Sequence, residues 1–306
     1  MNRFLSRLLW SVATMLGTAV LTFILLNALP GDVARVIAGS KASPEVIKEI
    51  HARFHLDDPW WKRLGLYLGQ LARGDLGRSY VTDQPVAEAI LTRLPTTAAL
   101  AALAGLMWMA VAVPLGVLSA RYRGSPFDRV TLVLATISLS LPSFWLARMM
   151  QYWLAYKLSW FPVAFFQSFR HLLLPAASLA ILFVGYYARL IHTQMVEVLD
   201  SPYIRAARAK GCSETRVLFK HALRNALIPV VTILGMDVAG MLGGVLFVEN
   251  VFALPGIGTL AVQSVFNLDP PMIMGTVLLS GALVVGANWA VDLSYRWIDP
   301  RIKGAH

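Results

Sequence analysis

Six long apolar stretches constrain this chain more than any other feature of its sequence. They cover residues 8–29, 96–120, 130–156, 172–191, 227–251 and 272–291. A helix of about 20 apolar residues crosses the hydrocarbon core of a bilayer, and each stretch reaches that length. Hydrophobic residues make up 57% of the chain and charged residues 14%, whereas roughly a quarter of the residues of soluble domains are charged. The sequence therefore predicts an all-α membrane protein with six transmembrane helices.

The basic residues predict how these helices are oriented. Arg3 and Arg7 precede the first helix, and three basic residues lie in 121–129 and seven in 189–224, but none lies in 252–271. Because Lys and Arg accumulate in short cytoplasmic loops, we expect both termini in the cytoplasm. A cleaved signal peptide is the alternative for the first stretch. Its apolar core exceeds the about 7 to 15 residues of a signal peptide, so we expect a retained anchor.

One long hydrophilic segment divides the chain into three regions. We expect a cytoplasmic tail and first helix over 1–29, an external lobe over 30–95 and a five-helix core over 96–306. Within the lobe, the sequence favours a helix that begins after Ser43, because serine caps helices and proline and acids suit their first turn. A second helix is expected after Asp58, followed by a turn at the glycine-rich residues 74–77.

A polar, basic segment over 200–229 interrupts the apolar pattern. Its charged and small residues are Arg205, Ala206, Ala207, Arg208, Ala209, Lys210 and Gly211. The small residues leave one side of a short helix with little steric bulk, which suits insertion into a groove of another protein. A cytoplasmic loop whose charges only enforce topology is the alternative. Cys212 is the single cysteine, so no internal disulfide and no thiolate metal cluster are expected.

The chain offers few groups for other chemistry. It lacks the Gly-x-x-x-x-Gly-Lys-Ser/Thr loop that cradles nucleotide phosphates, so we expect no ATP hydrolysis by the chain itself, no cofactor and no enzyme activity. It also lacks a basic and aromatic nucleic-acid module. His51 and His55 have the spacing of one helical turn. A metal role and a solvated helix face are the two interpretations of this pair, and we expect no metal site.

Three residues stand out within the apolar stretches or next to their ends. Pro142 is predicted to bend the third helix, because proline removes a backbone donor. Arg148 is costly in an apolar span; it either reaches the outer interface or faces a passage for an anionic group. Asp292 is either a packing carboxylate or a proton carrier. The fifth stretch is expected to pack closely against other helices through its small residues. These are Gly235, Gly240, Gly243 and Gly244.

Several short strings resemble the permease subunits of bacterial dipeptide, oligopeptide and nickel ABC importers. Besides the basic segment, they are 141–147 (LPSFWLA), 252–258 (FALPGIG), Asn288-x-x-x-Asp292 and 299–302 (DPRI). The strings at 74–77 (GDLG) and 29–32 (LPGD) resemble the first permease subunit of that family. The resemblance covers almost the whole chain. It implies an ABC importer permease bundle in a bacterial inner membrane, with an external lobe after the first helix.

The resemblance also implies a role for the basic segment. It is similar to the family's coupling segment, in which Glu-Ala-Ala is followed by three residues and then Gly. The resemblance implies that residues 203–212 insert into a groove of a separate ATPase subunit and that Gly211 ends the helix. Here Arg205 replaces the acid, and 226–229 (ALIP) stands further on than the family's Ile-x-Leu-Pro. The coupling residues carried over are Tyr203, Arg205, Ala206, Ala207, Arg208, Ala209, Lys210, Gly211 and Cys212.

The function implied is a permease for di- or oligopeptides, with nickel or metallophore complexes as alternative cargo. The implied partners are a related permease, two ATPase subunits, a periplasmic or lipid-anchored solute-binding protein and membrane lipid. The lobe and 252–271, which is expected to be non-helical or half-inserted, are candidate docking surfaces for the binding protein. An ion-coupled transporter would need more ionisable groups in the membrane. An intramembrane enzyme would need a His near Ser140 or Ser143, and their span has none.

Overall fold

The computed structural model describes residues 3–28, 33–39, 42–242 and 245–298. These described residues form two compact units. The first contains described residues up to 97 together with 242, 245–246 and 255–286, and the second contains 98–241, 247–254 and 287–298. Both units are built from helices, and the described residues hold no strand beyond one isolated bridge between Arg78 and Pro85. The predicted all-α class is confirmed.

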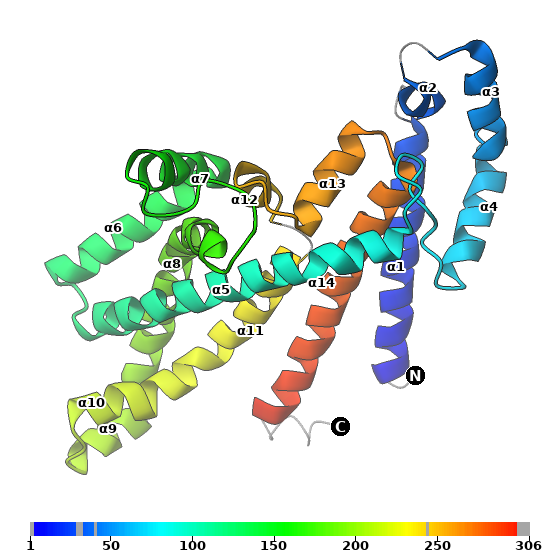
Figure 1. Ribbon diagram of the computed structural model, residues 1–306. Coiled ribbons are helices and arrows are strands. Elements are labelled where there is room, and N and C mark those ends of the chain that lie inside the picture. Colours follow the sequence, from blue (N-terminus) through cyan, green and yellow to red (C-terminus); the bar gives the residue numbers. More distant parts are fainter. Residues whose placement is uncertain (1–2, 29–32, 40–41, 243–244, 299–306) are drawn as a thin grey trace. The chain divides into compact units, whose positions relative to one another are not determined.

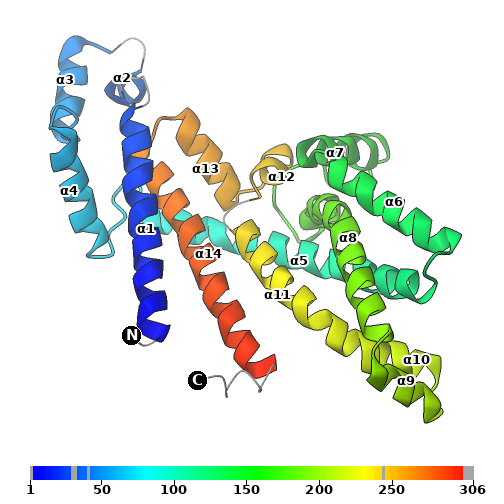
Figure 2. The same cartoon turned by 180° about the vertical axis from the view of Figure 1, so that it is seen from behind.

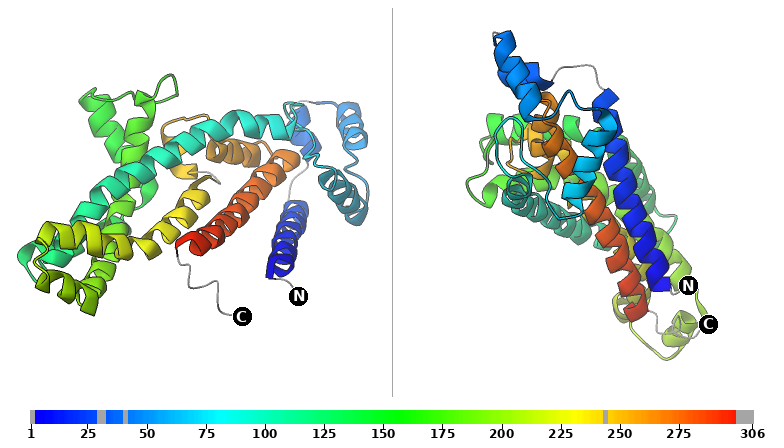
Figure 3. Two further views of the ribbon diagram at one scale, coloured as in Figure 1. Left: turned by 90° about the horizontal axis from the view of Figure 1, so that it is seen from below. Right: turned by 90° about the vertical axis from the view of Figure 1, so that its right-hand side faces the viewer.

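The first unit joins the N-terminal part of the chain to residues 255–286. Its helices are α1 (Arg3–Ala28), α2 (Val33–Ala38), α3 (Pro44–Arg53), α4 (Trp60–Leu71), the start of α5 (Val86–Arg121), α13 (Ile257–Phe266) and most of α14 (Pro270–Ile298). Helices α1 and α14 run side by side (Figures 1 and 3). Phe23 of α1 and Leu278 of α14 share a buried cluster with Tyr67 of α4. This cluster fixes α4 against the two long helices.

A second buried cluster holds α13 in place and corrects the prediction for 252–271. Val86 and Ile90 of α5 pack with Ile257 and Leu260 of α13 and with Met272 of α14. Of the two predicted alternatives, non-helical or half-inserted, the non-helical one is wrong for α13, which is a ten-residue helix. Its apolar residues gain more from burial along one face of a helix than from a loop, whose backbone polar groups would need partners.

The second unit contains the remaining helices. They are the rest of α5, α6 (Pro126–Ser140), α7 (Ser143–Met150), the π-helix η1 (Gln151–Lys157), α8 (Arg170–Leu199), α9 (Pro202–Ala209), α10 (Glu214–Arg216), the π-helix η2 (Val217–Ala222), α11 (Leu223–Leu242) and most of α12 (Leu246–Val251). Helices α6 and α8 pack closely at Gly185, where an added Cβ would lie 2.7 Å from the Ala135 Cα and would overlap the Ser138 hydroxyl. Small residues commonly permit such approaches in membranes.

The apolar helices agree with the predicted spans in part. Among the described residues, four helices are long and apolar enough to cross a membrane, and the bent pair Pro126–Ser140 and Ser143–Lys157 makes up to five. The two members of this pair meet at 99°, which confirms the predicted bend at Pro142. The described part of α14 contributes a shorter apolar helix, Pro270–Gly286. The described residues thus account for fewer full spans than the six predicted.

The fifth predicted stretch is not one continuous helix. Helix α11 ends at Leu242, and α12 is a separate six-residue helix. The glycine-rich sequence at this point has low helix propensity. Gly243 and Gly244 lie outside the described residues, as does the side chain of Asp292. Nothing lies within 4 Å of the Cβ position of Gly240, so the close packing predicted for these glycines does not occur there.

The hydrophilic segment 30–95 forms the two helices that were predicted for it, but its two histidines do not lie on one helix. Helix α3 begins at Pro44 as expected, although the Ser43 side chain makes no cap hydrogen bond. The helix ends at Arg53, so His55 is not on the same helix face as His51. His51 Nδ1 lies 2.8 Å from an oxygen of Asp57. In the described part of the chain, no group of three or more His, Cys, Asp or Glu could hold a metal ion.

Candidate functional site

Helix α9 begins at a proline and ends at the glycine that the sequence predicts. Ser201 stands at the N-cap with extended backbone, and Pro202 occupies the first helical position, where its missing N–H costs nothing. After Lys210, Gly211 adopts a left-handed conformation with φ of +77°. The Gly211 N–H donates to the Arg208 carbonyl at 2.9 Å, and the Cys212 N–H donates to the Ala207 carbonyl at 3.2 Å. This pair of bonds is a Schellman motif, so the prediction that Gly211 ends the helix is confirmed.

One buried side chain anchors α9, and most of its other side chains are exposed. Ile204 is completely buried, and α9 contacts both α8 and η2. Ala207 and Cys212 are partly buried. The exposed members of the nine predicted coupling residues are Tyr203, Arg205, Ala206, Arg208, Ala209, Lys210 and Gly211. The helix therefore presents small and basic side chains outward from a single apolar attachment point, at the far end of α8 (Figure 2).

Arg208 forms an ion pair within the chain that the sequence reasoning missed. Its Nε lies 2.8 Å from Glu214 Oε1, and Arg121 Nη1 at the end of α5 lies 3.8 Å from Glu214 Oε2. All three side chains are partly exposed, so each pair contributes about 0–1 kcal/mol. Their effect is geometric, because they link the ends of α5 and α9 through one carboxylate. The isolated acid after Ser213, within an otherwise basic segment, was the sequence signal for this link.

A groove with one basic end lies between α9 and the start of α11. The volume of the groove is about 720 Å³. Asn225 Nδ2 donates a hydrogen bond to Tyr203 Oη at 2.6 Å, which joins α11 to α9 at the groove. The lining residues are Tyr203, Lys220, His221, Arg224, Asn225, Leu227, Ile228 and Val231. The sequence reasoning did not identify this groove, although residues 220, 224, 228 and 231 follow the spacing of one helix face.

Arg148 is an exposed residue of α7 with a defined partner. Its Nη1 donates to Gln151 Oε1 at 2.8 Å. Gln151 is 6% exposed, and its amide nitrogen donates to the Val163 carbonyl at 2.8 Å and to the Val251 carbonyl at 2.9 Å. Gln151 thus joins three segments of the second unit and orients the guanidinium. The sequence reasoning singled out Arg148 but missed Gln151, which is the buried member of the pair.

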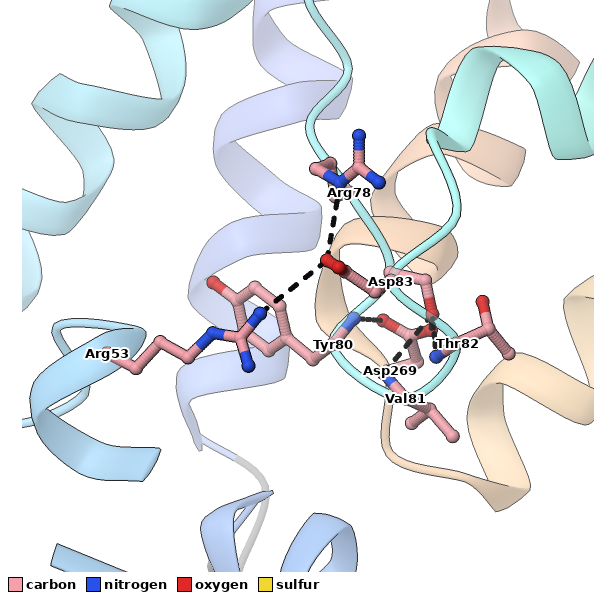
Figure 4. Close-up of polar contacts among 8 residues, drawn as sticks. Arg53, Arg78, Tyr80, Val81, Thr82, Asp83 and Asp269 are labelled. Atoms are coloured by element: carbon pink, nitrogen blue, oxygen red, sulfur yellow. Dashed lines mark hydrogen bonds and ion pairs between the residues drawn. The ribbon is translucent and has the colours of Figure 1, made fainter. Parts of the chain in front are cut away.

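In the first unit, a loop over 77–85 is fastened to the start of α14; we call it the clasp loop. The Ser79 hydroxyl donates to Asp269 Oδ2 at 2.5 Å and accepts the Val81 and Thr82 N–H groups at 3.2 and 2.9 Å. The Tyr80 N–H donates to Asp269 Oδ1 at 3.1 Å. Figure 4 shows the Asp269 carboxylate inside the curve of this loop. One buried carboxylate therefore sets the shape of the turn.

The clasp loop also contacts α3 and the residue that follows it. The Tyr80 ring stacks on Phe54 with centroids 4.1 Å apart. Arg53 Nη2 lies 3.8 Å from Asp83 Oδ1, and Arg78 Nε lies 3.2 Å from the same oxygen (Figure 4). Burial raises the pKa of the Tyr80 phenol; the Arg63 charge lowers it and the Asp269 charge raises it further. No local pattern predicts this site, because Ser79 and Asp269 are 190 residues apart.

Comparison with known proteins identifies the family of this chain. Residues 112–304 match the family described as binding-protein-dependent transport system inner membrane component, and residues 1–101 match the N-terminal family of the same membrane components. The chain belongs to the binding-protein-dependent transport permease family. This permease is therefore an integral inner membrane subunit of an ABC importer, a component that is itself non-catalytic. The family predicted from the short strings is confirmed.

Similar proteins align with the permease over nearly its whole length. A putative peptide transport system permease protein of Brucella abortus is 43% identical, over 98% of both chains. A dipeptide transport system permease protein of Alkalihalophilus pseudofirmus is 36% identical, over 97% of this chain and 98% of the relative. A glutathione transport system permease protein of Salmonella choleraesuis is 38% identical, over 99% of both.

A solved structure supports the fold of the permease. The inward-facing MetNI methionine ABC transporter has a chain that matches with a TM-score of 0.57 over 68% of the permease and 95% of that chain. At 20% sequence identity, this likeness extends to the fold alone. The ABC importer permease fold predicted from the sequence is confirmed. Among the described residues, four or five helices have the length and composition of a membrane span.

Proposed function

We propose that the permease carries di- or oligopeptides inward across the bacterial inner membrane. The observation that carries this proposal is the alignment, from end to end, with relatives whose names refer to peptides, dipeptides and the tripeptide glutathione. The permease works with a related permease subunit, and the two together enclose the passage. Nickel or metallophore complexes are the second candidate cargo, which rests on the sequence resemblance alone.

Helix α9 is the proposed contact with separate ATPase subunits. This proposal places residues 200–229 and both termini in the cytoplasm. Its exposed side carries Ala206 and Ala209 beside Arg205 and Lys210, which suits insertion of a slender basic helix into an acidic or polar groove. The buried Ile204 and the Arg208–Glu214 pair connect α9 to neighbouring helices of the second unit. Movement of the ATPases would therefore move α9 with these helices, as one packed body.

The polar segment 30–95 is the proposed external lobe, and a periplasmic or lipid-anchored binding protein delivers the peptide to it. The clasp loop supports this role, because Asp269 holds an exposed turn that bears Arg78 and Asp83. A rigid turn loses little conformational entropy when a partner binds. Segment 252–271 supports the same docking surface from inside, because its buried Asp269 carboxylate holds the exposed turn.

Arg148 is the proposed contact for a negatively charged group of the cargo. The Gln151 side chain fixes the Arg148 guanidinium at 2.8 Å, and a guanidinium matches the geometry of a peptide carboxylate. Arg148→Met should then lower transport of a C-terminally free peptide more than that of its C-terminal amide. Equal transport of the two peptides by the variant, at the wild-type rate, would favour the alternative in which Arg148 reaches the outer interface.

The proposed cargo can be tested with the permease purified together with its partner subunits and reconstituted in liposomes. Dipeptides and short oligopeptides, presented with the binding protein, should stimulate ATP hydrolysis several-fold. Nickel–histidine complexes should leave the basal rate unchanged. Stimulation by nickel complexes and none by peptides would replace the first candidate cargo with the second.

The proposed coupling role of α9 can be tested by Gly211→Arg. The added side chain meets open space but forces a strained left-handed backbone at φ of +77°, so α9 should end differently and peptide-stimulated ATP hydrolysis should fall. Gly124→Arg is a matched control, because Gly124 has φ of +79°, equally open surroundings and a place in the loop between α5 and α6, outside the proposed lobe. Full stimulation in the Gly211 variant would argue against coupling through this turn.

A further inference from the structure

The basic groove beside α9 has two cations that form no ion pair with the residues that the structure describes. Among the described residues, Lys220 and Arg224 form no ion pair, whereas Arg208 and Arg121 both reach Glu214. Lys220 and Arg224 are both exposed and line the groove together with His221. Two neighbouring cations repel each other unless an anion lies between them. This end of the groove is therefore suited to an anionic group supplied from outside the chain.

The rest of the groove is apolar and continues along the same helix. Leu227, Ile228 and Val231 follow the basic residues, with Ile228 36% exposed and Val231 45% exposed. The eleven residue-to-residue steps from Lys220 to Val231 rise about 16 Å along a helix, and half of a bilayer core measures about 15 Å. The groove therefore changes from charged to apolar over the depth of one leaflet.

Tyr203 and Asn225 stand where the two parts of the groove meet. Tyr203 is 44% exposed, and its hydroxyl accepts a hydrogen bond from Asn225 Nδ2 at 2.6 Å. Tyrosine is enriched at the level of lipid headgroups because its ring is apolar and its hydroxyl is polar. The sequence of cation, tyrosine and aliphatic side chains along one wall matches the order of phosphate, glycerol and acyl chain in a phospholipid.

We propose that this groove binds one anionic phospholipid of the cytoplasmic leaflet. Lys220 and Arg224 hold its phosphate, and an acyl chain lies along Leu227, Ile228 and Val231. Because Tyr203 belongs to α9, the bound lipid bridges the proposed coupling helix and α11. The cytoplasmic position rests on the proposed function. A peptide carboxylate could use the same two cations, but a peptide has no reason to require the exposed aliphatic wall.

Native mass spectrometry of the full-length permease in detergent tests this proposal with defined lipids. Dioleoyl phosphatidylglycerol should remain bound to the wild type, and dioleoyl phosphatidylcholine should be lost. A basic side chain near an anionic lipid contributes about five-fold to binding, so Lys220→Gln combined with Arg224→Gln should weaken phosphatidylglycerol retention about thirty-fold. Arg216→Gln is the matched control, because Arg216 is an exposed cation of the same segment outside the groove.

Two further arms separate a lipid from other anions. Ile228→Asn combined with Val231→Asn should weaken phosphatidylglycerol retention while leaving the two cations in place, and glycerol phosphate or an acidic tripeptide should not compete with the lipid. Equal retention in the Lys220 and Arg224 double variant, or competition by the tripeptide, would overturn the proposal. Lipid retention requires no transport, so this result stands apart from the peptide-stimulated ATP hydrolysis that tests the proposed function.

Discussion

At the scale of single residues, Asp269 carries an unusual share of the local structure. Its side chain is 3% exposed and accepts hydrogen bonds from the Ser79 hydroxyl and the Tyr80 N–H. Hydrogen bonds to a charged acceptor are stronger than neutral ones. The turn bearing Arg78 and Asp83 therefore depends on a carboxylate that enters from the far end of the sequence.

Asp269→Ala should loosen the clasp loop. It leaves the Ser79 hydroxyl and the Tyr80 N–H without their acceptor, at a cost of about 1–3 kcal/mol. Amide hydrogen exchange over residues 79–83 should accelerate about ten-fold or more. Asp57→Ala is the control, because this carboxylate of the same unit is exposed. Unchanged exchange in the Asp269 variant would show that the loop is held by its other contacts.

Tyr67 should make the first unit sensitive to high pH. Burial raises the pKa of its phenol to about 12, and the buried hydroxyl has no hydrogen-bond partner among the described residues. Because the folded pKa lies above the ordinary value of about 10, the neutral phenol favours the folded state fully below pH 10. That contribution is lost as the pH rises towards 12.

Tyr67→Phe tests this pH dependence. It removes a buried hydroxyl that lacks a partner, so stability at pH 7 should be equal or higher. Thermal unfolding followed between pH 9 and 12 should show a smaller loss of stability than in the wild type. An identical pH profile in the two proteins would contradict the assigned burial of the phenol.

At the scale of elements, close helix approaches define the second unit. Gly116 of α5 and Gly185 of α8 each occupy positions where an added Cβ would lie 2.7 Å from atoms of the facing helix. Packing of this kind replaces the hydrophobic effect, which does not drive association between helices inside a bilayer. The bend at Pro142 then directs α7 away from the axis of α6.

Gly185→Ala should destabilise the second unit. The added methyl group overlaps the Ser138 hydroxyl and crowds Ala135, and overpacking of this kind costs about 1–3 kcal/mol. Gly240→Ala is the matched control in α11, since nothing lies within 4 Å of its Cβ position and alanine favours a helix. Thermal unfolding in detergent should give a lower midpoint for the first variant alone. Equal midpoints would show that α6 and α8 separate at little cost.

The sequence predicted some elements of the fold correctly and missed others. Helix α9, its end at Gly211 and the bend at Pro142 were predicted, because proline and glycine determine backbone conformation locally. Helix α13 was missed, because proline and glycine at its start were interpreted as signs of a loop throughout. The Gln151 contacts and the clasp loop depend on residues about 100 and 190 positions away, and a single sequence carries no signal for such pairings.

At the scale of the whole molecule, the family accounts for features that the residues alone left open. The alignment over 98% of the chain makes this a permease of an ABC importer. Composition already predicted a membrane protein. The remaining step, from a basic segment to a lever moved by ATPases, depends on where α9 lies in the assembled transporter.

Photo-crosslinking in the assembled transporter tests that step most directly. Cys212 is the single cysteine, so Cys212→Ser provides a background in which Ala206→Cys on α9 can carry a benzophenone maleimide. Illumination should join the permease to an ATPase subunit, and the same label at Thr136→Cys, an exposed position of α6, should not. Absence of an ATPase product from position 206, or equal products from both positions, would contradict the account of α9 as the coupling helix.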